Sequence, residues 1–198
     1  MKYFTPELYV ALQQCNTPAA FREVNARWER AVQQYHSRLT ELQCANHQRP
    51  SEGQRVIRAL HRLINLGSLH DAEVRELGMT DGRRLVLVLR EENRVGTLLL
   101  TYSLVNDPLI HHALIPPEHR SVPRIWLYDE LERVAGASHT ITHAGRESEF
   151  PVYCHSILLS DGIELVLKFY RIEVVEIHPL LERDPVALPR EEYMDNIS

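Results

Sequence analysis

The chain has 198 residues, of which 44% are hydrophobic and 25% charged, with a formal net charge of −5. This composition is that of a globular protein, so disorder along the whole length is excluded. Nucleic-acid binding requires clustered lysines and arginines, and no such cluster stands out. No stretch approaches the run of about 18 apolar residues that a membrane span needs. The first residues, MKYFTPELYVALQQCN, also lack the apolar run of a signal peptide.

The first third of the chain has the pattern of helices. Thr5 and Pro6 form a helix start, because threonine caps a helix and proline suits its first position, and they predict a short helix to about Gln14. Thr17 and Pro18 repeat this start. Behind it, apolar residues at steps of three and four predict one long helix: Phe21, Val24, Trp28, Val32, Tyr35, Leu39 and Leu42. After a break, a second stripe predicts another helix that ends at Gly67: Val56, Ile57, Leu60, Leu63 and Ile64.

From Ser68 the apolar period changes from about 3.6 to about 2 residues, which predicts strands. These are expected at 69–77, at 83–91 behind an Asp-Gly turn, and at 95–104. The second of them is apolar on both faces, which predicts a central position covered on each side. The proline-rich stretch 105–124 is expected to be a surface loop. A second Asp-Gly hairpin spans 151–177, and a change of apolar phase predicts a bulge near Tyr170 or Arg171.

The stretch VPRIWLYDELERVAG, residues 122–136, fits two structures. Pro123 near its start, Gly136 at its end and apolar residues at steps of four and three favour a helix. As a strand, the same stretch would place Trp126, Tyr128, Glu130 and Glu132 on one face. The pattern alone favours the helix slightly.

Three blocks of sequence resemble an uncharacterised bacterial family of cytosolic proteins, known only as a domain of unknown function. They are MKYFTPELY at the start, LHDAEV with DG and LVLVL in the middle, and WLYDEL with HSILLSDGIELVLKFYRIEV late in the chain. The late block also resembles β-sheet modules of bacterial immunity-type proteins. The resemblance covers residues 1–178 and implies a strand from Trp126 to Glu132. It implies no activity, and the stretch GASHTITHAGRESEFP is inserted between the two late blocks.

Together these patterns predict an α+β protein, in which an amino-terminal helical hairpin packs on a mainly antiparallel β-sheet, either a curved sheet or a sandwich. We expect a helical region at 1–66, an antiparallel β domain at 67–178 and an extended tail at 179–198. The three cysteines are far apart and form no C-x-x-C motif, so we predict reduced thiols in a cytoplasmic protein.

The dipeptide His70-Asp71 raises the question of an active site. On a strand, neighbouring side chains point to opposite faces, so His70 would face the packed side and Asp71 would face water. The two could act together only if they preceded the strand. We therefore interpret His70 as a structural histidine.

A metal cluster is a second possible site. His155 has the same apolar phase as His70, and with Asp129 and Glu130 nearby the four residues are candidate ligands. The close spacing of usual metal motifs is missing, and the glycines form no phosphate-binding loop. No cofactor is therefore predicted.

Three functions remain open. The main hypothesis is a non-catalytic protein-interaction module, possibly immunity-like, that meets an unidentified protein partner through Trp126, Tyr128, Glu130 and Glu132. Packing of the helices on that same face is the competing explanation. The alternative function is a metal-assisted hydrolase using His70, Asp129, Glu130 and His155. A third is a sheet curved enough to hold a small ligand. Neither nucleic acid nor membrane is an expected partner, and the oligomeric state stays open.

Overall fold

The computed structural model describes residues 1–46, 59, 69–90, 96–112, 115, 120 and 122–177, and at 43–46 and 143 it describes the backbone alone. Two helices, α1 (Pro6–Gln13) and α2 (Pro18–Asn46), begin at the two predicted starts. Thr5 caps α1, since its side chain accepts a hydrogen bond from the backbone N–H of Leu8 at 3.3 Å. Of the further helix expected near 51–66, only Ala59 is described, and the expected tail lies outside the described residues.

The first three strands form the predicted hairpins, but the first begins at Glu73 and not at Leu69 as predicted. They are β1 (Glu73–Thr80), β2 (Arg84–Arg90) and β3 (Thr97–Leu104), and each pairs antiparallel with the next. The Asp-Gly turn joins β1 to β2, with Gly82 at a φ of 74°. Glycine suits this position because it adopts a positive φ without strain.

The remaining strands correct two predictions. The expected loop at 105–124 contains a short strand, β4 (Leu109–His112). The stretch from Trp126 is the start of β5 (Trp126–His143), so the slightly favoured helix is wrong and the strand is right. Antiparallel pairing of β5 with β6 (Arg146–Leu159) decides between them, because it satisfies the backbone of both strands. The last strand is β7 (Ile163–Ile177).

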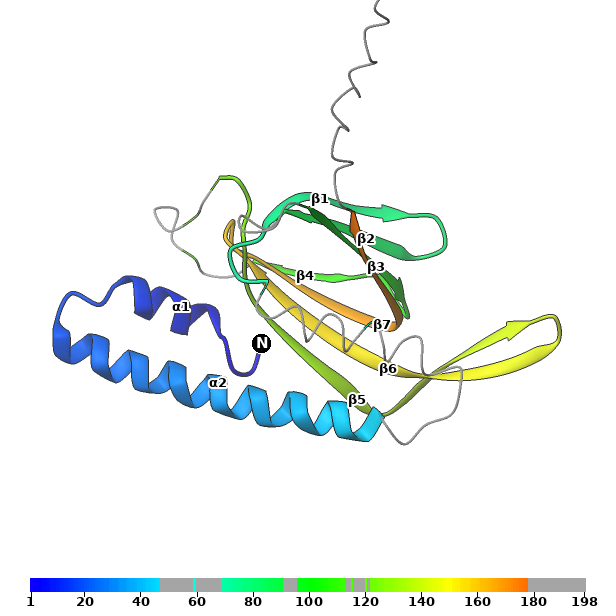
Figure 1. Ribbon diagram of the computed structural model, residues 1–198, viewed down its shortest axis with the longest axis horizontal. Helices are drawn as coiled ribbons and strands as arrows, with labels where there is room; N and C mark the ends of the chain where they lie inside the picture. Colours follow the sequence, from blue (N-terminus) through cyan, green and yellow to red (C-terminus); the bar gives the residue numbers. More distant parts are fainter. Residues whose placement is uncertain are drawn as a thin grey trace, which may run out of the picture.

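The strands form one antiparallel sheet in the order β1-β2-β3-β7-β6-β5, and β4 also pairs with β7. The sheet curls, so that its two edge strands meet at one end. There, Trp126 N–H donates to Ala72 O at 2.9 Å and Val74 N–H donates to Arg124 O at 2.8 Å. The architecture is α+β, as predicted, with the sheet curved (Figure 1).

The inner face of the curled sheet carries the main core. Alternate residues of β2 and β3 point into it, among them Leu87 and Leu100, which are paired across the two strands. On the outer face, α1 and α2 lie on the β5 side of the sheet, away from β1, β2 and β3 (Figure 1). The outer side chains of β2, Val86 and Val88, are half-buried. The described helices do not cover them, because these helices pack against β5.

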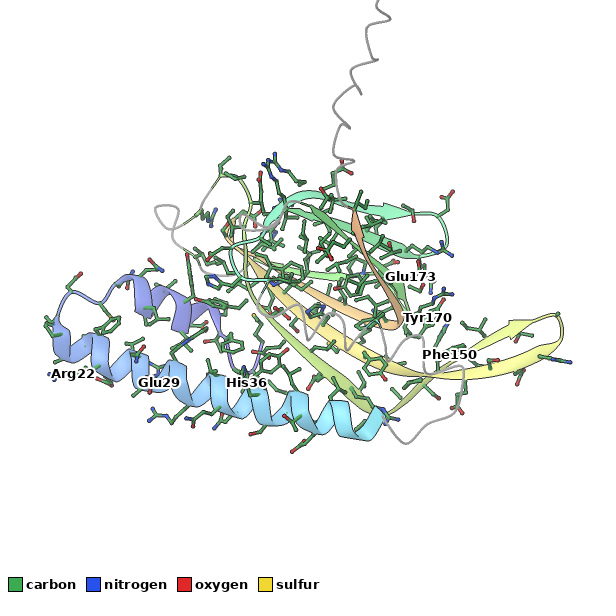
Figure 2. All side chains as sticks on the ribbon, viewed as in Figure 1. Arg22, Glu29, His36, Phe150, Tyr170 and Glu173 are labelled. Atoms are coloured by element: carbon green, nitrogen blue, oxygen red, sulfur yellow. The ribbon has the colours of Figure 1, made fainter. Side chains whose placement is uncertain are left out.

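The far ends of β5 and β6 project beyond the sheet as a two-stranded arm, which contains the inserted stretch (Figure 1). At its base, the ring of Tyr170 stacks on His139 with centroids 4.5 Å apart and contacts Phe150 at 5.9 Å; Figure 2 labels Phe150 and Tyr170. Tyr170 has no partner on β3, since Ser103 pairs with Arg171 and Leu104 with Phe169. The predicted bulge is thus confirmed.

Candidate functional site

The face of β5 on which the interaction hypothesis rests is divided by a bulge. Trp126 pairs with Leu159 and Tyr128 with Leu158, so Leu127 is an extra residue between them. Trp126 therefore belongs to the inner core and is fully buried, whereas Tyr128 faces the helices. The expectation that Trp126 shares a face with Tyr128, Glu130 and Glu132 is wrong, because it assumed unbroken alternation.

Tyr128 lies at the centre of a group of rings that joins the helices to the sheet. Its ring centroid is 4.7 Å from that of Trp28 on α2, 5.7 Å from Phe4 and 5.9 Å from Tyr9 on α1. His70 contributes a fourth ring at 5.0 Å. Burial raises the pKa of the Tyr128 phenol to about 12. Its surroundings are those of a packed side chain.

Glu130 anchors the amino-terminal residues to the sheet. Its side chain is 7% exposed, and its two carboxylate oxygens accept hydrogen bonds from three consecutive backbone N–H groups. These are Lys2 at 2.6 Å, Tyr3 at 2.6 Å and Phe4 at 2.7 Å. A buried carboxylate is tolerated when its oxygens are satisfied in this way. The carboxylate of Glu130 is thus occupied within the chain.

Two ion pairs extend this anchor. Lys2 Nζ lies 2.7 Å from Glu132 Oε2, and the Met1 amino group lies 2.6 Å from Glu164 Oε1 on β7. The hydrogen bond that Lys2 Nζ donates to Glu132, together with the negative charge of Glu132, raises the pKa of Lys2. The face predicted to meet a partner is therefore covered largely by the chain's own amino terminus and helices. Packing of the helices on this face was the explanation that competed with partner binding in the sequence analysis.

On the inner face, His155 joins three strands in a buried polar network. The imidazole is 0% exposed, with Nδ1 2.9 Å from the Tyr102 hydroxyl and Nε2 2.9 Å from Asp129 Oδ2. Because a carboxylate only accepts, Nε2–H donates to Asp129, and in the neutral ring Nδ1 accepts from Tyr102. The other oxygen of Asp129 accepts from Trp126 Nε1–H at 3.0 Å. Every polar atom of the imidazole is satisfied, which is typical of a structural histidine.

The four candidate metal ligands are not brought together. Asp129 and His155 are in contact, but Glu130 lies on the opposite face of β5, and His70 contacts Tyr128 on that same outer side. Among the residues that the structure describes, no group of three His, Cys, Asp or Glu side chains is placed to hold an ion. The hydrolase hypothesis required these four side chains to lie together, and the structure does not place them so.

His70 and Asp71 form the dyad that a strand would have separated. They lie in a turn before β1, and Asp71 has a φ of 70°, in the left-handed region. His70 Nδ1 is 2.8 Å from Asp71 Oδ2, and both side chains are exposed. The expectation that they point to opposite faces is therefore wrong, because the extended backbone begins only at Glu73.

Sequence reasoning missed a second surface, the outer apolar strip across β2, β3 and β7. Val88 pairs with Leu99, and Leu99 pairs with Val175, so their side chains form one row on the outer face. Val175 is 45% exposed and Ile177 is 50% exposed. The strip has five members: Val86, Val88, Leu99, Val175 and Ile177. The two apolar faces of residues 83–91 were the signal that could have revealed it.

Comparison of the chain with family models, curated proteins and solved structures found no significant match. None of the helices in the described part of the chain is both long enough and apolar enough to cross a membrane.

Proposed function

We propose that this chain is a non-catalytic protein-interaction module of the cytoplasm that binds a protein partner through the outer apolar strip. The observation that carries this proposal is the exposure of Val175 and Ile177 beside Val88 and Leu99 on one sheet face. Contiguous apolar surface of this kind is what protein interfaces bury. The described helices lie on the far side, against β5 (Figure 1).

Two further observations favour a binding role over a catalytic one, and a third suits the cytoplasm. The inner face is filled by the core, and the buried His155 has both ring nitrogens bonded within the chain. The candidate metal ligands are divided between two faces. Of the three cysteines, Cys15 and Cys154 are described, and neither is in a disulfide, which suits a reducing compartment. An immunity-like role is one form of the proposal, and it rests on the sequence resemblance.

The test is a quantitative pull-down from the native host with the full chain and two variants. The double variant V175E/I177E places two carboxylates on the strip, where burial at an interface leaves them unpaired. We expect a reproducible partner whose recovery falls about tenfold or more with this variant. The matched control is Phe21→Glu, because Phe21 is 51% exposed but lies on α2.

Thermal unfolding by circular dichroism establishes that the variants are folded before the comparison. Equal recovery of the partner by V175E/I177E and by the unaltered chain would exclude the outer apolar strip as the binding surface. A pull-down that returns no reproducible partner would argue against the interaction role itself.

A further inference from the structure

A pocket of about 310 Å³ lies between the amino-terminal residues, α1 and one side of α2. Arg27, Arg30 and Gln34 line one wall, and their spacing of three, four and seven residues places them on the same face of the helix. Leu8 and Ala31, which are both buried, provide apolar surface beneath them. This site is separate from the outer apolar strip.

The lining of this pocket is positively charged in a chain whose net charge is −5. It includes Lys2, Arg27 and Arg30 but no carboxylate. Within the described residues neither arginine makes an ion pair. Glu132 holds the Lys2 ammonium at 2.7 Å. Arg27 and Arg30 lie three residues apart on α2 and repel each other, and an anion between them would remove that repulsion.

We propose that this pocket binds a small phosphate monoester, with Arg27 and Arg30 as the principal contacts. A guanidinium group presents a planar pair of N–H donors that matches a phosphate or carboxylate. The two arginines, which make no ion pair with the described residues, favour a dianion, and a phosphate monoester carries a charge of about −1.5 to −2 near pH 7.

Neutral donors complete the pocket. Thr5 Oγ1 accepts the hydrogen bond from Leu8 N–H, so its own hydroxyl hydrogen can be donated to a phosphate oxygen. Gln34 contributes an amide. A volume of about 310 Å³ lies near the lower limit of ligand pockets, about 300 Å³, so the ligand is a small molecule.

Isothermal titration calorimetry of the full chain with glycerol 3-phosphate tests the site. The titration is made at physiological ionic strength, where weak surface attraction is screened. We expect a dissociation constant of about 1 mM or tighter. Glycerol and acetate, which lack the dianion, are expected to bind at least about tenfold more weakly.

Matched variants assign the contacts. Arg27→Gln and Arg30→Gln are each expected to weaken binding about tenfold or more, since each removes a charged hydrogen-bonding partner. Arg27→Lys keeps the charge but loses the planar donor pair, so it should weaken binding less than Arg27→Gln. The control is Arg22→Gln, because Arg22 lies on α2 outside the pocket and should leave binding unchanged (Figure 2).

All three arginines are exposed, and circular dichroism verifies that each variant is folded. The proposal is overturned if glycerol 3-phosphate gives no binding up to about 10 mM. Acetate binding as tightly as glycerol 3-phosphate would overturn the phosphate assignment. Unchanged binding by both glutamine variants would exclude this pocket.

Discussion

At the scale of single residues, Glu130 does the most to attach the amino terminus to the sheet. Three consecutive backbone N–H groups, from Lys2 to Phe4, need an acceptor where they meet β5, and one carboxylate serves all three. Hydrogen bonds to a charged group are stronger than those between neutral groups. A buried N–H group that lacks an acceptor also destabilises the fold. In the part of the chain that the structure describes, the neighbouring Glu132 makes an ion pair with the exposed Lys2.

Glu130→Gln should lower the free energy of unfolding by roughly 2–4 kcal/mol. The amide keeps a single acceptor oxygen, and its NH₂ group faces backbone donors. Urea-induced unfolding followed by circular dichroism measures the change. Glu132→Gln is the control, with an expected loss of about 0–1 kcal/mol, as for other exposed pairs. A larger loss for Glu132→Gln than for Glu130→Gln would contradict this account of the anchor.

At the scale of the elements, β5 is the strand on which helices and sheet meet. It pairs with β6 along one edge, and beyond the short contact with β1 its other edge faces α2. Tyr35 of α2 covers this edge, since the backbone N–H of Leu131 donates to its hydroxyl at 2.8 Å. An uncovered edge strand offers unpaired donors to other chains, so a helix side chain placed here protects the strand.

Tyr35→Phe should speed the hydrogen exchange of the Leu131 amide by about tenfold or more, because the amide loses its acceptor. Hydrogen exchange followed by NMR measures this residue directly. Tyr9→Phe is the matched control: it removes a hydroxyl that makes no hydrogen bond to the residues described in the structure. An unchanged rate in Tyr35→Phe would mean that the hydroxyl does not protect β5.

At the scale of the whole molecule, buried and half-buried tyrosines from three elements couple folding to alkaline pH. Burial is the main cause that raises the pKa of each of three tyrosines, Tyr35, Tyr102 and Tyr128. The pKa of Tyr128 rises to about 12. Below pH 10 or so, both folded and unfolded states keep these protons. Above it, the unfolded chain loses protons that the folded chain retains, so the free energy of unfolding falls as the pH rises.

We therefore expect the stability to decline from about pH 10, and the part due to Tyr128 to be lost by about pH 12. Unfolding by urea at a series of alkaline pH values measures the decline, and the absorbance of tyrosinate follows the ionisation. Tyr128→Phe should show a smaller decline between these pH values than the unaltered chain. The same decline in both would contradict the contribution of Tyr128.

The identity of most described elements could be predicted because their signals are local. The helix starts at Thr5 and Thr17, the two Asp-Gly hairpins and the bulge at Tyr170 follow from capping, turn chemistry and apolar phase. The strand β5 was harder to predict from the sequence, because the spacing of its apolar residues also suits a helix. Its pairing with β6 decides the matter, and pairing joins residues that no local pattern connects.

The candidate site could be predicted only in part. Asp129 and His155, both named as candidate metal ligands, are in contact, but the partner of the imidazole on β3, Tyr102, could not be found from alternation alone. At two places the backbone departs from a regular strand, and side chains there point in directions that alternation does not predict. The extra residue Leu127 turns Trp126 inward, and the left-handed Asp71 brings its carboxylate to His70.

The sequence by itself determined the α+β class, the antiparallel hairpins and the apolar positions, because periodicity and turn chemistry act over a few residues. Only the tertiary structure decided which face each side chain occupies. A bulge of one residue reverses the alternation of a strand, and its position depends on the pairing of distant segments. For this reason Glu130 holds the amino terminus, while the outer apolar strip lies on β2, β3 and β7, away from α2 (Figure 1).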